Sequence, residues 1–214
     1  MRFEKLLDLV GELPWFDLAT VVQLTSEPRK TLIEQLHRFA RAGKLVPLRR
    51  GMYALAEPYR RVAIQPAELA GALRRPSYLS GLWALAFHGI VPEHVPVYTS
   101  VTTRSPRLFE NGFGRFEYRN VKQSLFFGCE PLEIMGRPVN LATPEKALVD
   151  LWHLEAGEWT KERIREMRFS PAGIISAERL GELVEGLGRP RIERAHRALL
   201  AVMKEEDDGA VEER

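Results

Sequence analysis

Apolar residues recur at helical spacing in three short segments at the start of the chain. The pattern predicts helices over residues 2–12, 17–24 and 27–42, with Ser26 as the N-cap of the third helix and Gly43 as its C-terminal stop. The third helix combines an apolar stripe with a basic outer face. A short helix, a tight turn and a longer helix with a basic outer face together predict a helix-turn-helix.

Two short extended segments follow the third helix. Residues 44–49 and 52–55 flank an Arg50–Gly51 turn, which predicts a two-stranded hairpin with arginines at its tip. Such a wing would hold cations beside the third helix, where a phosphate backbone would run. The alternative is a three-helix bundle whose basic face is only solvated.

After a linker at residues 58–65, the pattern changes from helices to strands and back to helices. This order predicts a mixed α/β domain instead of a repeating βαβ unit. Ser77 is expected to cap a helix that is apolar nearly all round, and Thr143 to cap a later one, with Pro144 at its first position. The helices are expected at 66–75, 77–87, 143–154, 161–168, 177–187 and 191–206, and the strands at 95–103, 114–121, 124–127, 131–135 and 138–141.

The expected fold class is α+β, because an N-terminal winged helix-turn-helix precedes the mixed α/β domain. The chain of 214 residues suits this division into two domains. The expected boundaries are 1–56 for the DNA-binding domain, 59–203 for the mixed α/β domain, and 204–214 for an acidic disordered tail.

Composition and charge narrow the class of partner. No apolar run is long enough to cross a membrane, the N-terminus lacks the apolar core of a signal peptide, and the single Cys129 excludes an intramolecular disulfide. We therefore expect a cytoplasmic protein without a membrane partner. Residues 26–61 carry nine cations and three anions, so a polyanion is the expected partner of this stretch.

The candidate DNA-binding residues fall into two groups. The first group is expected to contact phosphates and to supply affinity that is independent of base sequence: Arg41, Arg49 and Arg50. The second lies near the start of the third helix and is expected to read base edges, with a guanine suited to the arginine and an adenine to the glutamine: Lys30, Thr31, Gln35 and Arg38.

Other groups of polar residues lack the spacing of a catalytic or metal site. Glu145, Lys146 and Asp150 share one capped helix, where the pattern favours a dipole contact and an i,i+4 ion pair on a solvated face. Ser80, His88 and Asp150 suggest a triad, but no nucleophile elbow surrounds the serine. The histidines lack metal-site spacing, and no phosphate-loop motif occurs. We expect no catalytic residue, metal or cofactor, and no enzymatic activity.

Four segments carry a family resemblance through their order along the chain: Arg50–Tyr53, Pro76–Ser80, Val97–Val101 and Ala142–Asp150. Over residues 14 to about 155, the chain resembles the AbiEi family, the antitoxins of type IV toxin–antitoxin systems. The resemblance implies a winged helix-turn-helix that represses its own promoter. It also implies a C-terminal domain that counters a nucleotidyltransferase-type toxin, and it leaves direct contact with that toxin open.

The expected partners are thus double-stranded DNA at the chain's own promoter and, functionally, a nucleotidyltransferase toxin. Two other functions remain open at this point. One is a nucleic-acid-processing enzyme that a winged helix directs to its substrate. The other is a stand-alone repressor whose C-terminal domain senses a small molecule. The identity of the neighbouring gene distinguishes the antitoxin from the ligand-responsive repressor.

Overall fold

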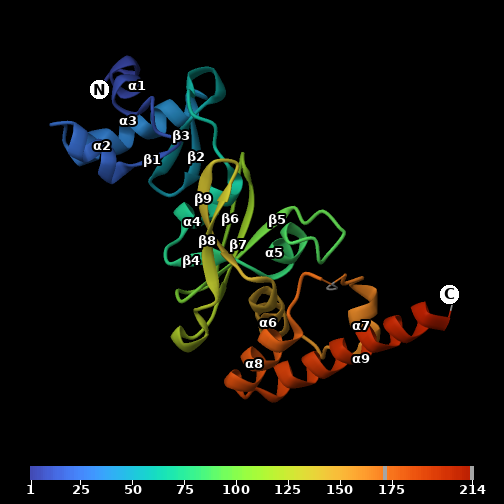
Figure 1. Cartoon of the computed structure of the whole chain (residues 1–214). Helices are drawn as coiled ribbons and strands as arrows, with labels where there is room; N and C mark the ends of the chain where they lie inside the picture. The colour runs from blue at the N-terminus through green and yellow to red at the C-terminus, as the bar shows by residue number, and fades with distance from the viewer. Residues whose placement is uncertain (171–172, 213–214) are drawn as a thin grey trace.

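The computed structural model describes the backbone of residues 1–170 and 173–212, and the side chains through residue 205. This part of the chain is a mixed α/β structure, about 46% helix and 22% strand, with nine α-helices and two sheets. In Figure 1 the N-terminal helices and their small sheet lie at one end, a larger sheet lies in the middle, and the last helices lie at the opposite end. None of the helices in the described ranges has the length and apolar character needed to cross a membrane.

The three N-terminal helices and the hairpin form as the sequence predicts. One further strand, β1, pairs antiparallel with β3 and completes a sheet of order β1-β3-β2. The elements in chain order are α1 Phe3–Val10, β1 Phe16–Asp17, α2 Leu18–Leu24, α3 Arg29–Arg41, β2 Leu45–Arg49 and β3 Met52–Leu55.

Local chemistry accounts for the ends of these helices. The Asp17 carboxylate accepts a hydrogen bond from the Thr20 backbone N–H at 2.8 Å and so caps α2. The prediction that Ser26 caps α3 is wrong: the N-cap is Pro28, and no side chain caps this end. Pro28 has an extended backbone with φ −58° and ψ 136°, so the helix begins one residue after it. Gly43 follows α3 with φ 68°, where a glycine is favoured.

The N-terminal unit has its own apolar core. Phe3 meets the rings of Phe39 and Tyr59 edge-on, at centroid distances of 5.2 and 4.8 Å. Tyr59 belongs to the short 3₁₀ turn η1 (Glu57–Tyr59), so the segment predicted as a linker packs back onto α1 and α3. The buried members of this core are Phe3, Leu6, Val10, Phe16, Val21, Leu32, Leu36, Phe39, Leu45, Tyr53 and Leu55.

A six-stranded mixed sheet forms the centre of the molecule, in the order β6-β7-β5-β4-β9-β8. Its central strand, β4, runs antiparallel to β5 and parallel to β9. The strands predicted at 131–135 and 138–141 are confirmed, and they pair antiparallel as β8 and β9. The strands are β4 Ser77–Leu79, β5 Val97–Thr102, β6 Arg107–Asn111, β7 Gly114–Asn120, β8 Cys129–Ile134 and β9 Arg137–Ala142.

Helices cover both faces of this sheet. The Tyr118 hydroxyl of β7 donates to the Ala70 carbonyl of α4, whereas the next residue, Arg119, donates to the Leu154 carbonyl of α6. Because alternate side chains of a strand point to opposite faces, α4 and α6 lie on opposite sides, as Figure 1 shows. The helices are α4 Pro66–Leu73, α5 Gly81–Phe87, α6 Pro144–Leu154, α7 Lys161–Glu166, α8 Ala177–Leu187 and α9 Pro190–Glu212.

Two predictions in this half are wrong. The predicted cap at Ser77 opens strand β4, and the helix starts at Gly81. Residues 77–79 are buried because β4 lies between β5 and β9 in the sheet. Hydrophobic periodicity alone does not distinguish such a buried strand from a buried helix. The predicted strand at 124–127 does not form: its first two residues belong to the 3₁₀ turn η2 (Gln123–Leu125), in which the backbone bonds locally. Strand β6 has no counterpart among the predictions.

The C-terminal helix α9 extends to Glu212, whereas the sequence analysis expects a disordered tail over 204–214. At Glu205 the helix is stabilised by ion pairs of the Glu205 carboxylate with Lys161, at 2.6 Å, and with Arg165. These two ion pairs fasten α9 to α7. Residues 213–214 lie outside the described residues.

The hairpin of β2 and β3 belongs to both cores. Tyr53 and Leu55 are buried in the N-terminal core, whereas Leu48 and Ala54 are buried in the core of the larger sheet. The Asn111 amide of β6 also donates to the Leu48 carbonyl of β2 at 3.1 Å. The hairpin therefore joins the two halves across the expected boundary at residues 56–59.

We predict that Asp17→Ala lowers the free energy of unfolding by about 1 kcal/mol through loss of the α2 cap. The hydrogen bond from the Thr20 N–H holds the pKa of Asp17 below its ordinary value of 3.8. The stabilisation is therefore present at neutral pH and is lost as the pH falls through the folded-state pKa. Urea unfolding at pH 7 and at pH 3 measures the difference. Asp8→Ala, which removes an exposed carboxylate within α1, is the control, and an equal loss in both variants contradicts the capping role.

Candidate nucleic-acid interface

Helix α3 presents a basic face to solvent. Its apolar residues Leu32 and Leu36 are buried, and this places Lys30, Arg38 and Arg41 on the exposed side. Among the described residues, none of these three cations forms an ion pair. Their charges are therefore available to an external anion.

The tip of the hairpin adds two arginines beside this helix. Arg49 ends β2, and Arg50 and Gly51 form the turn, where the glycine has φ 73°. The Gly51 carbonyl accepts from the Leu18 N–H at 2.9 Å, which ties the tip to the start of α2. The tip is thereby held in place by backbone contacts, and the arginine side chains stay at the surface.

Two hollows lie between α3 and the hairpin, with volumes of about 520 and 320 Å³. Both are lined by His37 and by the tip residue Arg50. Arg29 lines the larger hollow, and Arg41 and Arg49 line the smaller one. The three predicted phosphate contacts thus come together in one groove. Arg29 and His37 were not among the predicted contacts, although their spacing from the buried stripe of α3 places them on its outer face.

The predicted base-reading residues occupy a different part of α3. Thr31, Gln35 and Arg38 do not line either hollow. The Gln35 amide donates to the Glu27 carboxylate at 2.8 Å, and the same carboxylate binds the N-terminal ammonium of Met1 at 2.6 Å. These hydrogen bonds, the one from the N-terminus first, hold the pKa of Glu27 below its usual range. Gln35 is therefore engaged within the protein, whereas Lys30 and Arg38 remain exposed.

The interface offers cationic and hydrogen-bonding groups to a ligand. Guanidinium groups on a rigid helix and hairpin suit the phosphate oxygens of a polyanion. Within residues 1–170 and 173–205, no three side chains of His, Cys, Asp or Glu come close enough to hold a metal ion.

The prediction that Glu145, Lys146 and Asp150 lie on a solvated helix face is wrong, because all three are buried. Lys146 and Asp150 form the expected i,i+4 ion pair, but each is no more than 2% exposed. The Lys146 ammonium also donates to the Tyr78 hydroxyl at 2.9 Å, and Ser80 donates to Asp150 at 2.7 Å. The prediction failed because the polar side of α6 packs against β4, which the sequence analysis placed in a helix.

The neighbouring polar residues also have structural partners. Buried Glu145 accepts from the Ser176 N–H at 3.0 Å, just before α8. His88 bonds through Nε2 to the Ala142 carbonyl at 2.9 Å and has no bond to Ser80 or Asp150. Ser80 is fully buried, so the suggested triad lacks both its base and access for a substrate. The cluster fastens α6 to β4.

We predict that Lys146→Met destabilises the protein by about 3–5 kcal/mol, because it leaves a buried carboxylate without its partner. The double variant Lys146→Met/Asp150→Leu removes both charges and recovers most of this loss. Urea unfolding measures both effects, and Lys122→Met, which removes an exposed lysine, is the matched control. A single variant as stable as this control contradicts the structural role.

Comparison with protein-family models and with curated protein sequences finds no match for this chain. The feature of this chain that bears most directly on function is the row of cations along α3 and the hairpin tip, none of which pairs with a carboxylate among the described residues.

Proposed function

We propose that this protein binds double-stranded DNA in a sequence-dependent manner, with α1–α3 and the β1-β3-β2 sheet acting as a winged helix-turn-helix. In this proposal α3 enters the major groove and the hairpin is the wing on the adjacent backbone. Lys30 and Arg38 contact base edges, and Arg41, Arg49 and Arg50 contact phosphates.

One observation carries this proposal. Arg41 of α3 and the two arginines of the hairpin tip, Arg49 and Arg50, line the same groove, and among the described residues none of these three has a carboxylate within 4 Å. If the basic face of α3 were only solvated, there would be no reason for the β2–β3 hairpin to place further cations beside it. Helix and hairpin together match the way winged helices contact a groove and its flanking phosphates.

The resemblance to the AbiEi family extends the proposal. It suggests that the DNA site lies in the chain's own promoter, that the protein represses that promoter in the cytoplasm, and that it counters a nucleotidyltransferase-type toxin. A gel shift with the upstream promoter fragment and a scrambled duplex tests the DNA site. Growth of cells expressing the neighbouring gene, with and without this chain, tests the antitoxin role.

We predict different losses for two arginine variants. Arg38→Ala removes a base contact and weakens binding to the specific duplex about 5- to 150-fold, the equivalent of about 1–3 kcal/mol, with little change on a scrambled duplex. Arg50→Ala removes a phosphate contact, so it weakens both duplexes alike and makes the slope of log K against log salt shallower by about 0.9. Fluorescence anisotropy titrations over a series of salt concentrations measure both quantities.

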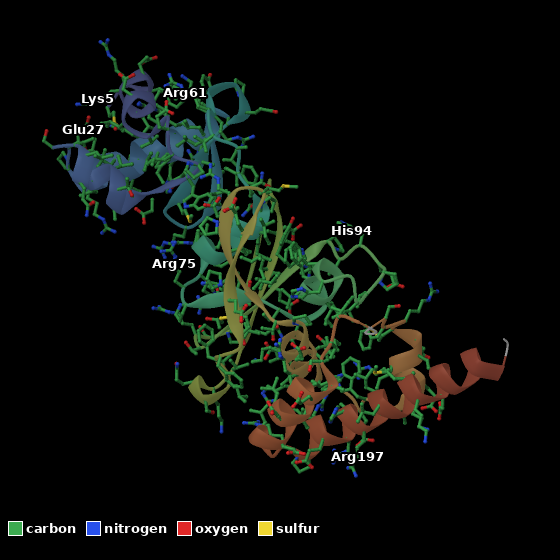
Figure 2. All side chains as sticks on the ribbon, in the orientation of Figure 1. Lys5, Glu27, Arg61, Arg75, His94 and Arg197 are labelled. Atoms are coloured by element: carbon green, nitrogen blue, oxygen red, sulfur yellow. The ribbon has the colours of Figure 1, made fainter. Side chains whose placement is uncertain are left out.

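Arg197→Ala is the control, because Arg197 is exposed on α9 at the far end of the molecule (Figure 2). It should leave both affinities and the salt slope unchanged. Equal losses on both duplexes for Arg38→Ala would argue against base reading by this residue. The absence of any duplex binding by the unaltered protein would refute the proposed function.

A further inference from the structure

A hollow of about 710 Å³ opens between α4 and the larger sheet, and we call it the β4–β9 hollow. Its walls come from α4, from the first parts of β4 and β9, and from Phe126 and Cys129. Among the described residues of these two parallel strands, Leu79 and Leu141 alone are paired with each other, so the strands separate ahead of this pair. The volume lies within the range of about 300–1,000 Å³ that is typical of small-molecule sites.

Small residues of α4 keep this hollow open. Ala67 and Gly71 are one helical turn apart, and both line it. A Cβ atom added at Gly71 would meet no atom within 4 Å beyond the backbone of its own helix. Glycine destabilises the interior of a helix relative to alanine, so local helix stability does not explain the glycine at this position.

The Glu68 carboxylate of α4 lines the hollow and is only partly satisfied by the protein. Its side chain is 17% exposed, and its Oε2 is buried without a hydrogen-bond partner among the described residues. Its ion-pair partner is Arg137 of β9, whose Nε lies 3.8 Å away, beyond hydrogen-bond distance. A mostly buried carboxylate loses much of its hydration, so a ligand that supplies N–H groups stabilises it.

Two exposed arginines lie at another part of the rim, near the end of β5. The Nε of Arg75 donates to the Gly71 carbonyl at 3.4 Å, which holds this side chain next to the hollow. Arg104 belongs to the loop between β5 and β6, and Arg74 fastens this loop to α4 through hydrogen bonds to Ser105 at 2.6 and 2.9 Å. Among the described residues, neither Arg75 nor Arg104 has a carboxylate within 4 Å.

The carboxylate and the two arginines lie on opposite sides of β4. In the sheet, β4 is flanked by β9, where Glu68 meets Arg137, and by β5, which Arg104 follows. Helix α4 rises about 7.5 Å from Glu68 to its last residue, and Arg75 lies beyond that end. The matching ligand therefore carries N–H donors at one end and an anionic group at the other. An α-amino acid, whose ammonium and carboxylate share one carbon, is too short to reach both.

The side chains between these ends suit a flat ring. Phe126 lines the hollow, and its ring lies 5.0 Å from the ring of Tyr78, centroid to centroid. Nucleobases of every kind stack on aromatic side chains. Guanine presents two adjacent N–H groups on its Watson–Crick edge, which match the two oxygens of one carboxylate, and phosphates match guanidinium groups.

We propose that the β4–β9 hollow binds a nucleoside phosphate, with its base between α4 and the separated strands and its phosphates at Arg75 and Arg104. Glu68 accepts hydrogen bonds from the base, and Phe126 stacks on it. The carboxylate selects guanine over uracil, because uracil has a single N–H and no amino group. The site goes beyond the proposed function and does not depend on duplex binding.

A neighbouring hollow of about 420 Å³ provides an internal comparison. Arg75 and Arg104 line both hollows, whereas Arg107 lines only the neighbouring one and Glu68 and Gly71 line only the β4–β9 hollow. In Figure 2, Arg75 lies beside the larger sheet, on the side nearest the N-terminal helices. The neighbouring hollow reaches the hairpin tip and is lined by six arginines: Arg49, Arg50, Arg74, Arg75, Arg104 and Arg107.

The test measures binding of GDP and UDP to the full chain by isothermal titration calorimetry in magnesium-free buffer. The unaltered protein should bind GDP about 5- to 150-fold more tightly than UDP. Glu68→Gln removes the charge at nearly constant size, so it should weaken GDP binding by a similar factor and UDP binding less. Arg104→Gln removes a phosphate contact and should weaken both nucleotides alike. Glu182→Gln, at an exposed carboxylate of α8, is the matched control for Glu68→Gln and should change neither affinity.

A second pair of variants tests the hollow by its volume. Gly71→Leu fills the space beside α4 and should abolish binding of both nucleotides. Gly181→Leu makes the same change at a glycine of α8 that also has no neighbour within 4 Å, and it should bind as the unaltered protein does. Leucine favours a helix more than glycine does, so both variants should fold, and thermal unfolding checks this.

Three results overturn the inference. The first is that the unaltered protein binds neither nucleotide, which leaves the proposed DNA binding intact. The second is a GDP affinity that is unchanged in Glu68→Gln or in Gly71→Leu. The third is GDP binding that Arg107→Gln abolishes and Glu68→Gln does not alter, which assigns the nucleotide to the neighbouring hollow. If Gly71→Leu does not fold, the loss of guanine preference in Glu68→Gln decides the question.

Discussion

The β2–β3 hairpin is buried on both of its faces, and this constraint organises the molecule. Tyr53 and Leu55 close the core of the N-terminal helices, while Leu48, Met52 and Ala54 pack into the core of the six-stranded sheet. Apolar side chains on both faces leave the polar residues of the hairpin no place except its tip. The tip arginines are therefore forced outward at the junction of the two halves, and any movement of one half would expose apolar surface.

This arrangement decides which side of the molecule carries the positive charge. The burial of one stripe of α3 turns its cations outward, and the anchored hairpin brings more cations to the same side. The end of α4 and the β5–β6 loop then continue the patch beyond the hairpin. A rigid basic surface assembled from several elements differs from scattered surface lysines, because its phosphate contacts can form together without reordering the protein. Such a surface suits a long anion better than a small one.

The buried cluster around Lys146 and Asp150 shows how the same residue types serve a different purpose. There the charges are paired, hydrogen-bonded to Tyr78 and Ser80, and closed off from solvent. At the basic surface the arginines are at least partly exposed, and within the described part of the chain none of them pairs with a carboxylate. Pairing and accessibility, more than residue identity, separate a structural tie from a binding surface.

The elements stabilised by local interactions could be predicted from the sequence alone. Helices α1–α3, the hairpin with its glycine turn, the β8–β9 hairpin and the Thr143 cap of α6 all depend on spacing, turn residues and capping over a few positions. The candidate phosphate contacts on α3 and the hairpin followed from the same patterns. Only the tertiary structure decided that the 77–79 segment is a central strand, that Lys146 and Asp150 are buried, and that four further arginines meet the hairpin tip. These features arise from contacts between residues far apart along the chain, and such pairings leave no periodic signal in the local sequence.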